Sequence, residues 1–101
     1  MGSPRGDIEV SLKLFSIEAG GRSGPTPPGH FNCLMTIDDY NFDVRLQLEN
    51  VGSISPGQEV RVPISFLNLK LAKQYCTLGR TFTLRESRVI GDGVIESILF
   101  S

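Results

Sequence analysis

Apolar residues recur at every second position through most of this chain, and this period of two constrains the fold more than any other feature. The stretch Ile8–Leu14 alternates apolar with polar side chains, and so does Phe42–Leu48. Successive side chains of a β-strand point to opposite faces, so such stretches are typical of strands with one buried face. The pattern predicts strands at residues 8–14, 31–37, 41–48, 60–66, 81–85 and 89–100.

The segments between these stretches carry turn and loop signals. Asp38-Asp39 predicts a tight hairpin turn between two strands. Glycines and prolines fill the segment Gly20–Gly29, which predicts a long loop of the kind that is more often functional than idle. The segment Leu67–Leu78 has alternating leucines but no capping signal, so it predicts neither a helix nor a clean strand.

Three residues inside the predicted strands have a special position. Proline cannot donate to a strand ladder, so Pro63 predicts an edge strand or a bulge. Gly91 and Gly93 in the last strand predict a bulge or a close approach of another backbone.

Six short strands with no convincing helix predict an all-β domain, built as a small six-stranded antiparallel barrel or as a sandwich. We favour the barrel, because closure removes exposed strand edges. A chain of 101 residues is the usual size of one domain. We assign residues 7–101 to that domain and residues 1–6 to a disordered tail, of which Met1–Ser3 fits a cloning remnant.

Composition argues against several functional classes. The net charge of −1 gives no long-range field that would favour a nucleic acid. Two cysteines without CxxC spacing and a single histidine, His30, predict reduced thiols, no metal site and no catalytic constellation. No apolar run approaches the ~20 residues of a membrane span. We therefore predict a cytoplasmic protein that is not an enzyme, needs no cofactor and does not enter a membrane.

Three motifs, in order along the chain, resemble the last β-barrel domain of elongation factor Tu and related translational GTPases. They are EAGGR at residues 18–22, ISPGQEV at 54–60 and GRTFTLRESRVIGDGVIESI at 79–98. The resemblance covers nearly the whole chain and implies a six-stranded antiparallel barrel. It implies no catalysis, because GTP hydrolysis in that family belongs to a separate N-terminal domain. It implies a binding surface, used in the family for the T-arm side of aminoacyl-tRNA, the GTPase domain and the nucleotide-exchange partner.

The resemblance also implies candidate binding residues. Arg22 matches the Gly-Gly-Arg loop near the tRNA, and the closing hairpin supplies Arg85, Arg88, Gly91 and Gly93. The family also has a basic residue near the tRNA, and Lys70 and Lys73 are the two candidates for its counterpart. Arginines and open backbone amides suit phosphate oxygens. The same residues also fit a structural role, with the arginines at exposed strand positions and the glycines in a bulge.

The chain departs from the family in the loops used for binding. The sequence after Arg22 continues as Ser23-Gly24-Pro25, the closing hairpin is one residue shorter, and the segment from Leu67 to Leu78 is longer. The leading prediction is therefore a non-catalytic binding module that recognises a protein partner. The alternatives are a translation-associated module that contacts tRNA or a ribosomal component, and an excised domain of a larger translational GTPase.

Overall fold

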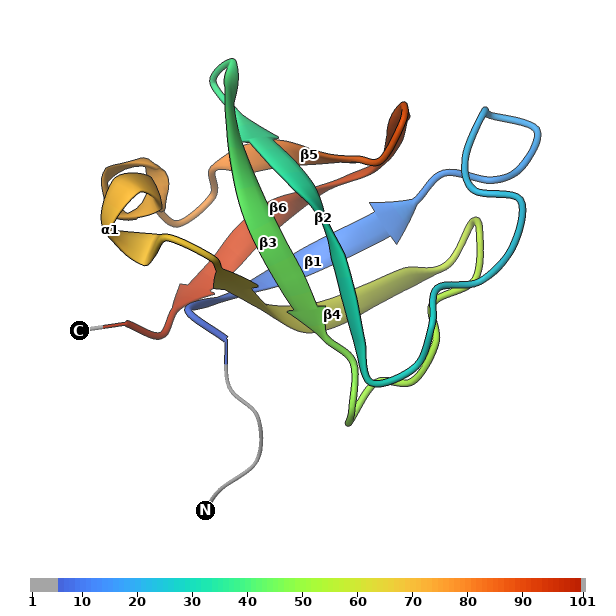
Figure 1. Cartoon of the computed structure of the whole chain (residues 1–101), viewed down its shortest axis with the longest axis horizontal. Helices are drawn as coiled ribbons and strands as arrows, with labels where there is room; N and C mark the ends of the chain where they lie inside the picture. Colours follow the sequence, from blue (N-terminus) through green and yellow to red (C-terminus); the bar gives the residue numbers. More distant parts are fainter. Residues whose placement is uncertain (1–5, 101) are drawn as a thin grey trace.

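The computed structural model describes residues 6–100, and its six strands close into an antiparallel β-barrel (Figure 1). The strands are β1 (Ile8–Leu14), β2 (His30–Ile37), β3 (Tyr40–Gln47), β4 (Glu59–Phe66), β5 (Thr81–Arg85) and β6 (Val89–Ile98). Their order around the barrel is β1-β4-β3-β2-β5-β6, and β6 pairs back onto β1. The prediction of a small six-stranded barrel is confirmed.

The predicted N-terminal tail lies outside the described residues except for Gly6. This glycine lies against the backbone of Ile64, where a Cβ on Gly6 would come within 2.5 Å of the Ile64 nitrogen.

The barrel interior is filled by the apolar half of each alternating strand. Ile8, Val10 and Leu12 of β1 are fully buried, and the polar residues between them face outward. Strands β2 to β5 contribute in the same way, whereas the irregular β6 buries Ile90 and Ile95. The alternation in the sequence therefore marks the residues of the core.

The β2–β3 hairpin closes through the predicted acidic turn. Asp38 and Asp39 have φ angles of 49° and 71°, and Ile37 pairs directly with Tyr40. A two-residue hairpin turn that matches the strand twist needs positive φ at both central residues, and Asp tolerates this conformation.

The glycines of β6 allow a close approach to β1. A Cβ on Gly91 would lie 2.6 Å from the carbonyl oxygen of Lys13, and one on Gly93 would lie 2.3 Å from that of Ser11. The β5–β6 ladder also shifts register between Leu84 and Arg85. The predicted close approach and bulge are both present.

Pro63 does not mark an edge strand, because β4 pairs with β1 on one side and with β3 on the other. Instead, Pro63 lies just past the end of the β3–β4 ladder, whose last pair is Leu46 with Ile64. The missing N–H is therefore compatible with a strand that has two neighbours.

The connection between β4 and β5 is the segment for which the sequence predicts neither a helix nor a clean strand. This connection contains one turn of helix, α1 (Leu69–Ala72), followed by the 3₁₀ turn η1 (Lys73–Tyr75). Asn68 at the N-cap makes no side-chain capping bond, which agrees with the lack of a capping signal in this segment. Ala72 and Cys76 are buried against the barrel, so packing holds this turn in place.

Candidate functional site

Arg22 is held by contacts within the protein. Its Nη1 lies 2.7 Å from Glu86 Oε2, and its Nε and Nη2 donate to the carbonyl oxygens of Gly24 and Pro25, both at 3.2 Å. The guanidinium also lies 4.9 Å from the centre of the Phe31 ring. Only 20% of the Arg22 side chain and 35% of the Glu86 side chain are exposed. Arg22 therefore fastens its own loop to the turn between β5 and β6.

Arg88 reaches the same loop from that turn. Its Nη2 donates to the carbonyl oxygen of Gly21 at 2.9 Å. Gly21 is buried, and a Cβ there would lie 2.1 Å from the carbonyl oxygen of Phe15. The structure thus brings Arg22 and Arg88 to the same loop, and both donate to groups of the protein itself.

The far end of the same loop is fixed by Thr26. Its N–H donates to the carbonyl oxygen of Ile54, and its hydroxyl accepts from the Ile54 N–H, both at 2.9 Å. The Gly/Pro segment between Gly20 and Gly29 is thereby tied to two other connections of the barrel.

The other predicted binding residues make no hydrogen bond with Arg22 or Arg88 within the described residues. Arg85 is exposed on the outer surface of β5. Lys70 and Lys73 belong to α1 and η1, on the opposite side of the barrel from the Arg22 loop (Figure 1), and the Lys73 ammonium lies 5.1 Å from the centre of the Phe100 ring. Gly91 and Gly93 pack against β1. The predicted residues do not form one surface.

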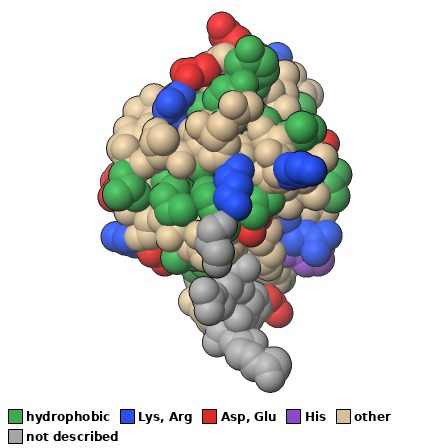
Figure 2. All heavy atoms as spheres, turned by 90° about the vertical axis from the view of Figure 1, so that its left-hand side faces the viewer, with side chains coloured by type: hydrophobic (Ala, Val, Ile, Leu, Met, Phe, Trp, Pro, Cys, Tyr) green, Lys and Arg blue, Asp and Glu red, His purple; other side chains and the backbone are tan. Residues whose placement is uncertain are grey.

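Sequence reasoning missed an apolar surface around α1. Its members are Tyr40, Leu67, Leu71, Tyr75 and Leu78, and we call this set the α1 face. Among residues 6–100, four of the six large hydrophobic residues that are exposed belong to it. Figure 2 views the molecule from the side that carries α1 and shows hydrophobic side chains there beside lysines and arginines.

Aromatic rings join the α1 face to the barrel. The ring centres of Tyr40 and Tyr75 lie 4.9 Å apart, and Tyr75 is 5.6 Å from Phe42. Phe42 in turn meets the buried Phe66 edge-on at 6.0 Å. The sequence signal for this surface was the set of leucines in the segment Leu67–Leu78, which predicted neither a helix nor a clean strand.

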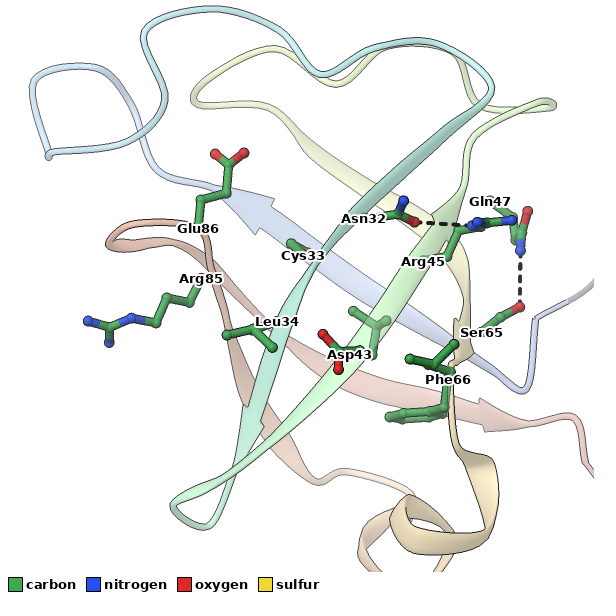
Figure 3. A pocket seen from close by; sticks show the side chains of 12 residues that line it. Asn32, Cys33, Leu34, Asp43, Arg45, Gln47, Ser65, Phe66, Arg85 and Glu86 are labelled. Atoms are coloured by element: carbon green, nitrogen blue, oxygen red, sulfur yellow. Dashed lines mark hydrogen bonds between the residues drawn. The ribbon is translucent and has the colours of Figure 1, made fainter.

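A groove of about 710 Å³ crosses the outer surface of the barrel beside the α1 face (Figure 3). Outward side chains of β2, β3, β4 and β5 line most of it, and Leu67 of the α1 face lies at its margin. Arg45 Nε donates to Asn32 Oδ1 and Gln47 Nε2 donates to Ser65 Oγ, both at 3.1 Å. The groove has a mixed lining, with polar side chains beside the half-buried Leu34 and the exposed Leu67.

The cysteines are unsuited to nucleophilic chemistry. Burial raises the pKa of Cys33 to about 12, with a smaller contribution from the Glu86 carboxylate. Burial likewise raises the pKa of Cys76 to about 11. The thiolate is the reactive form, so both groups are protonated and unreactive near neutral pH.

Residues 6–100 contain neither a cluster of three metal-ligating side chains nor a membrane-spanning helix. No group of three or more His, Cys, Asp or Glu side chains in this part of the chain is placed to hold a metal ion. Over the same residues, no helix has the length and apolar character needed to cross a membrane.

No model of a known protein family matches the chain, and no curated protein matches it in sequence. The resemblance to the last barrel of elongation factor Tu therefore stays a prediction, and the surfaces described above carry the functional argument.

Proposed function

We propose that this protein is a non-catalytic binding module that docks a protein partner on the α1 face, in the cytoplasm. The observation that supports the proposal is the gathering of exposed apolar side chains on one connection of an otherwise alternating barrel. Leu67, Leu71 and Leu78 all come from the segment between β4 and β5, and Tyr40 stacks on Tyr75 of the same segment. Contiguous exposed apolar patches commonly mark interaction sites.

The composition of the α1 face suits a protein partner. Protein interfaces have apolar and aromatic centres with a polar rim, and here Lys70 and Lys73 adjoin the leucines and tyrosines. RNA is the competing partner from the family resemblance. It is less favoured, because Arg22 and Arg88 donate to Glu86 and to backbone carbonyls of the protein itself.

The test compares two serine substitutions at similar exposure. Leu71 in α1 is 62% exposed and Ile17 in the loop after β1 is 58% exposed, so Leu71→Ser and Ile17→Ser remove similar apolar surface from different faces. Each protein is used to capture partners from a lysate of the source cells, with and without ribonuclease. The captured protein is then purified, and its binding is measured by calorimetry.

We expect a protein that is retained after ribonuclease treatment and binds wild type with a negative heat-capacity change. Leu71→Ser should weaken binding at least about tenfold, because burying a leucine contributes about 1.5–3 kcal/mol, and Ile17→Ser should leave binding unchanged. Equal binding by both variants would contradict the proposed face. Capture that ribonuclease abolishes would favour a translation-associated module that contacts tRNA or a ribosomal component.

A further inference from the structure

We infer that the groove across β5, β2, β3 and β4 binds an extended segment of the protein partner, with an acidic side chain placed opposite Arg85. The inference rests on the proposed function, since the groove continues from the α1 face at Leu67. It adds the chemistry of the segment that is recognised.

The charges that line the groove favour a carboxylate. Two acidic and two basic residues line it: Asp43, Glu86, Arg45 and Arg85. Glu86 is already paired with Arg22, 2.7 Å away. Arg45 donates to the neutral amide of Asn32, and this bond does not offset its positive charge. The groove therefore presents two positive side chains, Arg45 and Arg85, and one remaining carboxylate, Asp43. This local excess of positive charge contrasts with the net charge of −1 of the whole chain.

The strand register fixes the order of these groups. Leu34 on β2 pairs with Arg85 on one side and with Asp43 on the other. The N–H of Leu67 donates to the carbonyl oxygen of Asp43 at 2.9 Å, which brings the row to the α1 face. Figure 3 shows Arg85 on one side of Leu34 and Asp43 on the other. A bound segment would thus meet a guanidinium, an aliphatic side chain, a carboxylate and then the leucines of the α1 face.

This order predicts how many residues separate the acidic residue of the partner segment from its apolar residues. The path from β5 to β4 crosses three inter-strand spacings of ~4.8 Å, or about 14 Å in all. An extended chain advances ~3.3 Å per residue, so it covers that path in about four residues. The partner segment should therefore carry an acidic residue about four positions from the apolar residues that contact the α1 face.

The amide side chains in the groove suit a peptide backbone. Asn32 uses its Oδ1 to accept from Arg45, and its NH₂ group makes no bond within the described residues. Gln47 donates to Ser65, and its Oε1 is likewise available. The groove thus offers both a donor and an acceptor to a peptide unit. A nucleic-acid backbone fits less well, because Asp43 would face its phosphates.

The test uses a phage-displayed library of random dodecapeptides, selected on the 101-residue chain. Sequences enriched on wild type should carry an aspartate or glutamate about four residues from a pair of apolar residues. Selection on Arg85→Gln should keep the apolar preference and lose the acidic one. Selection on Leu71→Ser should lose the apolar preference.

Affinity measurements on one selected peptide give the magnitude. Arg85 makes no side-chain bond within the described residues, so Arg85→Gln should fold normally, and its urea midpoint will check this. Fluorescence anisotropy should show a loss of about threefold to fivefold for Arg85→Gln, as for an exposed ion pair. Lys13→Gln is the matched control: it removes one positive charge from β1, outside the groove, and should leave the affinity unchanged.

Different results would contradict the inference about the groove and the proposed function of the α1 face. Enriched peptides with an apolar pair but no acidic preference would overturn the inference and leave the α1 face standing. Equal binding of the selected peptide by Arg85→Gln and Lys13→Gln would also overturn the inference alone. Peptides whose binding is insensitive to Leu71→Ser, or a selection that enriches no apolar motif, would overturn both the inference and the proposed function.

Discussion

Replacing Arg22 by alanine separates a structural role for this arginine from a binding role. The substitution removes two hydrogen bonds to the Gly24 and Pro25 carbonyls, the ion pair with Glu86 and the contact with the Phe31 ring. A hydrogen bond that involves a charged group contributes about 1.5–3 kcal/mol, but these bonds share one side chain and are partly exposed. We therefore expect the free energy of unfolding to fall by about 2 kcal/mol in total, which corresponds to roughly 10 °C in the melting temperature of a domain this size.

The measurement is urea unfolding followed by circular dichroism, with Arg61→Ala as the control. Arg61 pairs with Glu9 at 2.9 Å, but their side chains are 55% and 34% exposed, so we expect a loss below about 1 kcal/mol. The slope of unfolding against urea should stay constant in both variants. If Arg22→Ala destabilises the protein no more than Arg61→Ala, the loop is not held in the way the contacts indicate.

Two further predictions concern packing and pH. Gly93→Ala should lower the free energy of unfolding by about 2 kcal/mol or more, because its Cβ would lie 2.3 Å from the Ser11 carbonyl oxygen. A Cβ on Gly24 would have no heavy atom within 4 Å, so Gly24→Ala should leave the free energy of unfolding nearly unchanged. Thermal melting compares the two variants. The pKa of Cys33 is raised from 9.0 to about 12, so the unfolded chain loses this proton first. Stability should therefore be full below pH 9 and fall by up to ~1.4 kcal/mol per pH unit between pH 9 and 12; urea unfolding of wild type and Cys33→Ala should show a shallower fall in the variant.

The strands and turns were predictable because they are encoded locally. Alternation over residues 8–14 and 42–48 gives both the strand and its buried face, and Asp38-Asp39 gives the turn. Glycines in β6 predicted the close approach of its backbone to that of β1. The helical turn α1 was missed because it is stabilised by burial of Ala72 and not by a capping residue.

The candidate surfaces were less predictable because they depend on pairs that are distant in sequence. Arg22 is 64 positions from its partner Glu86, and no local pattern connects them. Arg85, Leu34 and Asp43 form a row because Leu34 of β2 pairs with Arg85 of β5 on one side and with Asp43 of β3 on the other. Sequence reasoning could name Arg22 and Arg85 as candidates, but the structure shows that one is bonded internally and the other faces a groove.

The closed barrel limits how a partner can bind. Every strand has two neighbours, so no strand offers its whole length as a free edge, and we expect recognition to use outward side chains. The loop after β1 turns its arginine inward, whereas the connection between β4 and β5 leaves its leucines in solvent. We therefore expect Arg22→Ala to lose stability and keep its partner, and Leu71→Ser to keep stability and lose its partner. The reverse pattern would move the binding surface to the Arg22 loop, one of the regions that the family resemblance implies.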